Sequence, residues 1–147
     1  MADACEVTGY NRDQLRGVLD KLPEFSERTV LPRSAREFTS QDLIVLSVLV
    51  ELERQIGVER DTAVSIEPLL RKALSGPKNV DSNARIFMSF NPAFAQYLTN
   101  GPLPQYDGVI VLLGPIFNRI DHYLIPGGTA RQADLTLGPT LMKKGVV

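Results

Sequence analysis

Apolar side chains recur at helical spacing in the first half of the chain. Leu15, Val18, Leu19 and Leu22 follow one another at intervals that place them on one face of a helix. Asn11 precedes this stripe and Gln14 lies three positions further on, which is the spacing of a capping box. The pattern therefore predicts a helix that begins after Asn11 and is stopped by Pro23.

Caps and apolar spacing predict further helices on both sides of this one. The predicted segments are residues 3–7, ended by Thr8-Gly9, residues 43–56, capped by Ser40 and ended by Gly57, and a piece that begins at Asp61 or Ser65 and stops at Gly76-Pro77. The segment 43–56 is apolar on nearly every face in its first half, which indicates burial on more than one side. Residues 24–37 show no helical period and contain Pro32, so we expect a loop or a loose hairpin there.

The second half favours strands. Residues 85–90 alternate, and residues 109–113 form a short β-branched run that is typical of a buried strand. Residues 92–98 begin with proline and are predicted as a short helix. Residues 116–125 fit both periods, and we favour a strand. The expected fold class is α+β, a mostly helical first part followed by a small region with two or three strands.

Composition divides the chain near residue 75. A length of 147 residues predicts one domain or one domain with an appendage, and a hydrophobic fraction of 44% is ordinary for a globular protein. Residues 1–78 hold 11 of the 16 basic and 13 of the 17 acidic residues. Turn-forming residues gather at 75–83. We therefore expect an N-terminal domain over 1–75, a linker over 76–83, a small α+β region over 84–126 and a loosely held tail over 127–147.

Candidate catalytic and metal-binding side chains are few. Cys5 and His122 are the single cysteine and histidine, so a disulfide framework, a zinc site and a nucleophile–base pair all lack residues. We expect no enzyme, no cofactor and no metal. The apolar run 43–50 is too short to cross a membrane and the first residues do not resemble a signal peptide, so we expect a cytoplasmic protein that does not bind membranes.

Residues suited to nucleic-acid contacts cluster in the first domain. Arginine neutralises phosphate, and Arg, Asn and Gln present forked groups that match base edges. The candidate DNA-binding residues are Asn11, Arg12, Gln14, Arg16, Arg28, Arg33 and Arg36. The alternative is that Arg12 and Arg16 pair with Asp13 and Asp20 on a solvated helix face.

The order of these segments resembles the DNA-binding domain of the MerR family. The resemblance covers residues 1–75: a short helix ended by Gly9, a second helix with Leu15-Arg16, a proline-containing loop, and the stretch REFTSQDL (36–43) before a long apolar helix. Gly57-Val58 matches the residues that precede the family's fourth helix. The resemblance implies a winged helix-turn-helix whose second helix enters the major groove of duplex DNA. The family's aromatic residues after Leu-Arg, its metal cysteines and its long C-terminal helix are absent here.

These observations lead us to expect a sequence-specific DNA-binding transcriptional regulator, of the kind encoded by phages or mobile elements. It would bind double-stranded DNA as a homodimer through residues 84–126. Two alternatives are an adaptor that uses the winged fold to bind a protein partner, and a DNA-packaging or recombination accessory protein. A small-molecule sensor is a further alternative, with an aromatic pocket formed by Phe87, Phe94, Tyr97, Phe117 and Tyr123.

Overall fold

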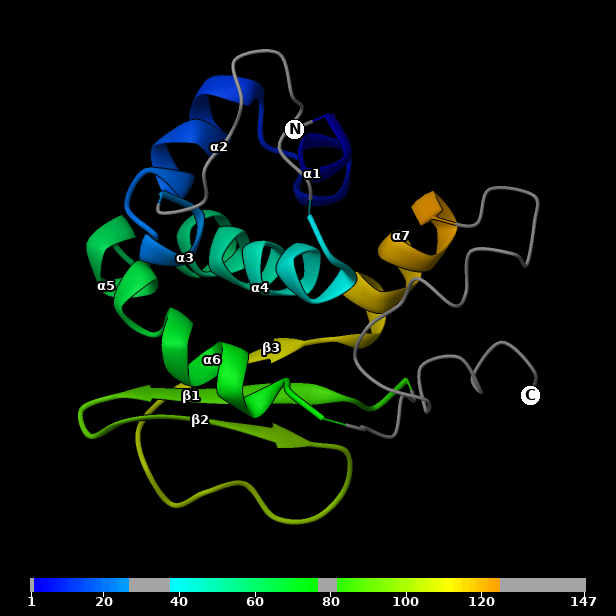
Figure 1. Ribbon diagram of the computed structural model, residues 1–147. Helices are drawn as coiled ribbons and strands as arrows, with labels where there is room; N and C mark the ends of the chain where they lie inside the picture. The colour runs from blue at the N-terminus through cyan, green and yellow to red at the C-terminus, as the bar shows by residue number, and fades with distance from the viewer. Residues whose placement is uncertain (1, 27–37, 77–81, 125–147) are drawn as a thin grey trace.

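A layer of helices rests on one face of a three-stranded antiparallel sheet (Figure 1). This computed structural model describes residues 2–26, 38–76 and 82–124. In chain order its elements are α1 (Ala2–Thr8), α2 (Arg12–Leu19), α3 (Pro23–Ser26), α4 (Ser40–Glu51), a π-helical turn η1 (Leu52–Ile56), α5 (Arg60–Ser65), α6 (Glu67–Ala73), β1 (Arg85–Phe90), β2 (Ala93–Leu98), β3 (Val109–Leu112) and α7 (Gly114–Leu124). The expected mixture of helices and a small sheet is confirmed.

Helix α4 is the centre of the helical layer. Every residue from Asp42 to Val50 is buried, because α1, α6 and α7 all pack against this helix. The predicted burial on several sides is therefore confirmed. The predicted cap at Ser40 is wrong by one residue, since the Thr39 hydroxyl accepts a hydrogen bond from the Asp42 amide and the Asp42 carboxylate accepts one from the Thr39 amide. Ser40 is the first helical residue and is buried.

The last turn of the predicted helix 43–56 widens into the π-helical turn η1. Gly57 ends it with φ +85°, a left-handed conformation that glycine adopts without strain from a side chain. The chain then turns into α5 and α6. Pro68 lies in the first turn of α6, where a missing amide hydrogen is tolerated.

The first helices form as their caps and spacing predict. Gly9 ends α1 with φ +82°, Asn11 caps α2, and Leu15, Val18 and Leu19 are buried. Pro23 was expected to stop α2. This expectation is wrong, because α2 ends at Leu19 and Pro23 instead opens α3, so the first residues of the expected loop 24–37 are helical.

The sheet follows the order β2-β1-β3, with both outer strands antiparallel to β1. The prediction for β1 is confirmed, and residues 109–112 of the segment predicted over 109–113 form the strand β3. The expectation that this strand is buried is wrong, because β3 is an edge strand in which Val111 is buried while Ile110 and Leu112 are exposed. The helix predicted over 92–98 is wrong. Residues 93–98 form β2, which pairs with β1 along its whole length, so the backbone groups that face β1 are satisfied in a hairpin.

The strand favoured for residues 116–125 is also wrong. Residues Gly114–Leu124 form α7, in which Ile116, Phe117 and Ile120 point into the core at helical spacing. Both periods were compatible with the sequence, and packing against α1 and α4 selects the helix. Arg119 adds a polar attachment, since its Nε donates to the Val7 carbonyl oxygen at 3.2 Å.

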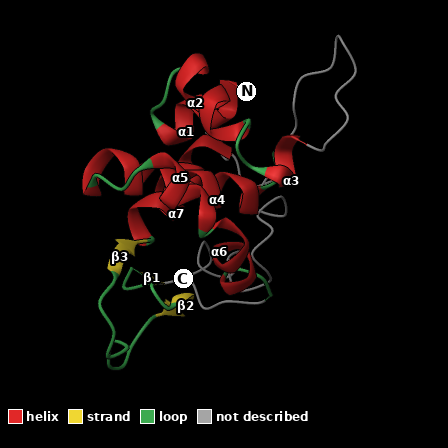
Figure 2. Cartoon of the chain, turned by 90° about the vertical axis from the view of Figure 1, so that its left-hand side faces the viewer, coloured by secondary structure: helices red, strands yellow, loops and turns green. Residues whose placement is uncertain are grey.

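One hydrophobic core joins the helices to the sheet. Ile86, Met88 and Val111 on the inner face of the sheet belong to the same buried cluster as Leu70 of α6 and Leu74, the residue that caps it. The core therefore continues across residues 76–83, the predicted linker. The long loop between β2 and β3 runs beneath the sheet (Figures 1 and 2), where Phe94 contacts both Phe87 and Tyr106.

Several predictions fall on segments outside the described residues. They are the loop over 27–37 with Arg28, Arg33 and Arg36, residues 77–81 of the linker, and the tail over 127–147. Among the helices that the structure describes, none combines the length and the apolar character needed to cross a membrane.

Candidate nucleic-acid interface

Helix α2 has one buried and one polar face. Leu15, Val18 and Leu19 are buried against the other helices. The residues around the beginning of the helix that lie outside this stripe are all exposed, and we call this set the α2 face: Asn11, Arg12, Asp13, Gln14 and Arg16. Figure 1 shows α2 at the end of the molecule farthest from the sheet, so its polar face lies on the outside of the helical layer.

The capping box engages the oxygens of two candidate residues. The Asn11 Oδ1 accepts a hydrogen bond from the Gln14 amide at 2.8 Å, and the Gln14 Oε1 accepts one from the Asn11 amide at 2.9 Å. Pairing with adenine needs both the oxygen and the nitrogen of such an amide. Because the cap holds each oxygen at the backbone, the groups that these two side chains have free to turn outward are their N–H donors, which suit phosphate oxygens and other acceptors.

The two arginines of the α2 face remain available for contacts. Arg12 forms no ion pair with any residue that the structure describes. Arg16 lies 4.0 Å from Asp13, and both side chains are more than half exposed. An exposed pair of this kind contributes little free energy, so a phosphate group can compete with Asp13 for Arg16.

Two further arginines lie against the α1–α2 unit from distant parts of the chain. A side-chain carbon on Gly9 would lie 2.7 Å from Nη1 of Arg54, and one on Gly17 would lie 2.5 Å from Nη1 of Arg60. The guanidinium groups therefore occupy space that only glycine leaves open. Sequence reasoning missed both contacts, because each joins residues more than 40 positions apart.

Arg60 belongs to a polar network that holds the turn before α2. Tyr10 donates from its hydroxyl to Glu53 Oε1 at 2.6 Å, and Arg60 donates to both oxygens of Glu53 at 2.8 and 3.1 Å. Burial and the bond to Glu53 raise the pKa of Tyr10 to about 12. Burial acts to raise the pKa of Glu53 as well, but the bonds from Arg60 and Tyr10 outweigh it, and the net effect is a lowered pKa.

A second network fixes the beginning of α4 to α6. Arg71 donates through Nε to Glu67 at 2.6 Å and through Nη1 to Asp42 at 2.8 Å, and its guanidinium lies over the ring of Phe25. Burial opposes the charge on Arg71, but the bonds to Glu67 and Asp42 prevail and raise its pKa. Helix α3 is thus held to α4 and α6 through one side chain.

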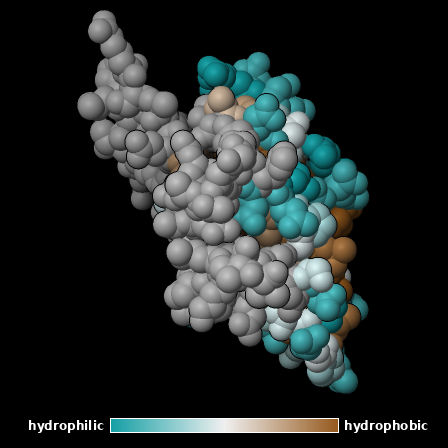
Figure 3. Space-filling view, turned by 90° about the vertical axis from the view of Figure 1, so that its right-hand side faces the viewer, coloured by the Kyte–Doolittle hydropathy of each residue, from teal (hydrophilic) through white to brown (hydrophobic). Residues whose placement is uncertain are grey.

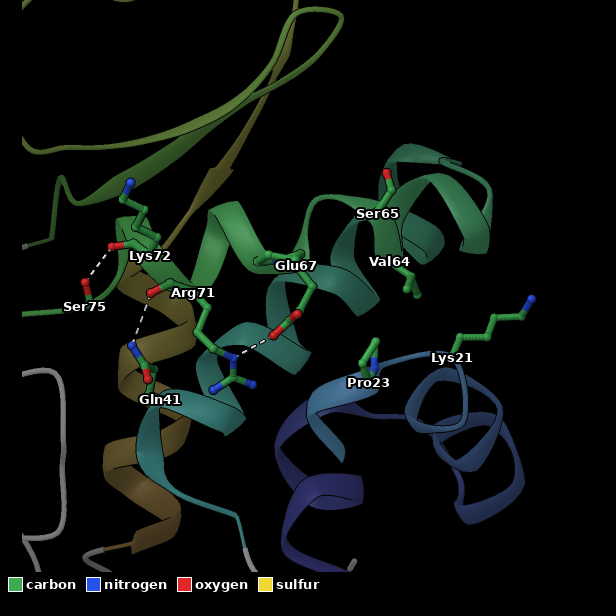
Figure 4. Close-up of a pocket in the computed structure, with 10 residues that line it drawn as sticks. Lys21, Pro23, Gln41, Val64, Ser65, Glu67, Arg71, Lys72 and Ser75 are labelled. Carbon is green, nitrogen blue, oxygen red and sulfur yellow. Dashed lines mark hydrogen bonds and ion pairs between the residues drawn. The ribbon is translucent and has the colours of Figure 1, made fainter. Parts of the chain in front are cut away.

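A pocket of about 750 Å³ opens beside this network (Figure 4). Lys21 and Pro23 form one wall, and Val64, Glu67 and Arg71 line the opposite side. Lys21 is paired with Asp61 at 2.5 Å, and the charges of Glu67 and Arg71 are paired with each other. These ion pairs link neighbouring elements around the pocket. Because the charges of Lys21 and Arg71 are paired, the pocket does not add a basic surface to the α2 face.

The aromatic side chains of the expected sensor pocket do not share a cavity. Phe87 and Phe94 contact each other on the outer face of the sheet. Tyr97 and Phe117 pack on the other face, within or against the main core. The expectation that these four residues line one pocket is therefore wrong, because alternation along β1 and β2 sends Phe87 and Phe94 to one face of the sheet and Tyr97 to the other, where Phe117 of α7 also packs. The side chains of His122 and Tyr123 lie outside the described residues.

Comparisons with known proteins add no relative. No protein-family model matches the chain, and neither a curated protein nor a solved structure matches it.

Proposed function

We propose that this protein is a sequence-specific DNA-binding regulator that places α2 in the major groove of duplex DNA and acts as a dimer. The observation that carries the proposal is the α2 face, where Arg12 and Arg16 are exposed and neither guanidinium is held in a buried ion pair. The alternative in which Asp13 neutralises Arg16 is weakened by their separation of 4.0 Å and their exposure.

The connection between α1 and α2 supports this reading. Residues 9–11 form a three-residue turn with a glycine at positive φ, as in helix-turn-helix units. The capping box fixes the beginning of α2, and the contact of Arg60 with Gly17 fixes its middle. A helix held at two points presents its side chains in a constant geometry, which direct reading of bases requires.

Arg54 extends the proposed surface. Its exposed guanidinium lies beside Gly9, at the turn that leads into α2, and no described carboxylate pairs with it. We propose that Arg54 contacts a phosphate next to the groove that α2 enters. A phosphate contact adds affinity without sequence information.

The first experiment measures by fluorescence anisotropy the affinity of the wild type and of an Arg12→Ala, Arg16→Ala double variant for a pool of random-sequence duplexes. The second selects the bound duplexes over repeated rounds and sequences them. The wild type should bind the pool and enrich one sequence. Loss of two phosphate contacts should reduce the slope of log affinity against log salt by about 1.8. Lys72→Ala, a charge removal on exposed α6, is the matched control and should bind as the wild type does.

Three results would count against the proposal. Equal affinity and equal salt dependence for the wild type and the double variant would show that the α2 face does not contact DNA. Absence of salt-dependent binding by the wild type would favour the protein adaptor instead. Binding of the pool without enrichment of any sequence would favour the packaging or recombination accessory protein.

A further inference from the structure

The outer edge of β3 lacks the features that usually protect a sheet edge. No strand among the described residues pairs with it, since the sheet ends there in the order β2-β1-β3. Edge strands are usually protected by charged residues, proline or a bulge. The stretch 108–118 contains no charged residue, and Leu112 and Ile110 are 60% and 38% exposed. Figure 3 shows hydrophobic surface along this margin of the molecule.

One hydrogen bond just beyond the end of β3 shows which of its backbone groups face β1 and which face the free edge. The Leu113 amide donates to the Ala84 carbonyl oxygen at 2.9 Å, in the register that pairs β3 with β1. In antiparallel sheets, hydrogen-bonded and non-hydrogen-bonded pairs alternate. The backbone groups of Val111 therefore point toward β1, whereas those of Ile110 and Leu112 point out of the sheet at the free edge.

The same two residues carry the exposed side chains. Ile110 and Leu112 are two positions apart, so their side chains lie on the same outer face of the sheet. An added antiparallel strand must match this face and must also offer its backbone groups opposite Ile110 and Leu112. A shift by one residue would place outward side chains opposite inward ones.

A second copy of this chain meets these conditions. A two-fold axis at Val111 places Ile110 opposite Leu112 of the second copy, and the reverse, in two hydrogen-bonded pairs. Two-fold axes at residue 110 or 112 also keep the faces aligned. They leave Leu112 opposite Gly108 or Ile110 opposite Gly114, however, so one exposed side chain then has no partner to cover it.

We propose that two copies associate through β3, antiparallel about a two-fold axis at Val111, to form one continuous six-stranded sheet. No like charges meet across such an interface, because β3 and its flanking residues are uncharged between Gly108 and Asn118. The choice of a second copy as the occupant rests on the proposed dimeric DNA binding. Helix α2 lies at the other end of the molecule, so the α2 face of each copy stays free (Figure 1).

The first test probes the register by cross-linking in a Cys5→Ala background. Val111→Cys should form a disulfide-linked dimer on mild oxidation, because the two Val111 positions form a non-hydrogen-bonded pair with Cα atoms about 4.5 Å apart. Val109→Cys is the control. It lies opposite Leu113 of the second copy and should remain uncross-linked.

The second test measures association by sedimentation over a range of protein concentrations, in the absence of DNA. The wild type should dimerise, and Leu112→Lys should weaken dimerisation by at least about tenfold, since it brings two charges into the interface. Leu103→Lys, on the exposed loop beneath the sheet, is the matched control and should dimerise as the wild type does.

A wild type that stays monomeric would overturn this inference, and so would a dimer that tolerates Leu112→Lys while Val111→Cys fails to cross-link. Failure of the proposed function is separate from both. A dimer that cross-links at Val111 but does not bind DNA would overturn DNA binding alone. A monomer that binds DNA through the α2 face would overturn the β3 interface and the dimeric mode of action, and would leave DNA contact by α2 in place.

Discussion

Replacing Arg71 with methionine removes the guanidinium that joins α4 to α6. Methionine is a flexible apolar side chain that can fill the space of the arginine stem, so the change mainly deletes the charge, its two hydrogen bonds and the contact of the guanidinium with the Phe25 ring. The two carboxylates that lose this partner are nearly inaccessible, with side-chain exposures of 1% for Asp42 and 5% for Glu67. Breaking a buried charge pair costs about 3–5 kcal/mol.

The side chain of Arg71 is 19% exposed, so water can reach part of the site. We therefore expect the lower end of this range, a loss of about 3 kcal/mol in the free energy of unfolding, or roughly a hundredfold in the equilibrium constant. The melting temperature should fall by about 6–12 °C. Urea denaturation followed by circular dichroism measures the change in the midpoint, and an unchanged slope would show that two-state unfolding is retained.

Lys72→Met is the matched control, because it removes the neighbouring, exposed charge from the same helix and should change stability by less than about 0.5 kcal/mol. Adding Glu67→Gln to Arg71→Met should recover part of the loss, since the buried charge that lacks its partner is then also removed. If Arg71→Met proves as stable as Lys72→Met, the network does not hold α4 to α6.

Three further changes test the local arguments. In Glu53→Gln the free energy of unfolding should depend less on pH in the acid range. Because the pKa of Glu53 is lowered in the folded state, its ionised carboxylate stabilises the fold above pH 4.5, and this stabilisation is lost as the pH falls through the lowered pKa. Urea titrations of the variant and the wild type across the acid range would detect the difference. Thr39→Ala should cost about 1 kcal/mol in thermal unfolding by removing the cap of α4, and an unchanged melting temperature would contradict that role. Gly57→Ala should cost about 1 kcal/mol through its backbone alone, because φ is +85° and no atom lies near the added carbon; a stabilised variant in the same melting assay would refute this.

Local signals explain why the first helices could be predicted. The box between Asn11 and Gln14 and the positive φ at Gly9 depend on residues within a few positions of each other. The polar side of α2 follows from the same spacing, so the exposed positions of Arg12 and Arg16 could be predicted as well. The capping-box spacing also predicts that the cap engages the side-chain oxygens of Asn11 and Gln14, and both hydrogen bonds are present.

Long-range pairing explains the failures. Residues 92–98 begin with proline and contain alanine and leucine, which suits a short helix, yet pairing with β1 makes them a strand. Residues 116–124 satisfied both periods, and the surface offered by α1 and α4 made them a helix. The supports of α2 could not be foreseen either, because Arg54 and Arg60 reach Gly9 and Gly17 only after the chain has folded back.

The amino-acid sequence by itself determined the cap of α2, the end of α1 at Gly9 and the buried stripe of α2, since these depend on neighbours along the chain. It also determined the uncharged character of β3. The tertiary structure alone decided the strand at residues 93–98, the helix at 114–124 and the networks around Glu53 and Arg71, because each depends on backbone or charge partners supplied by distant residues. Tertiary structure also decided which backbone groups of β3 point outward, since its pairing with β1 sets that phase.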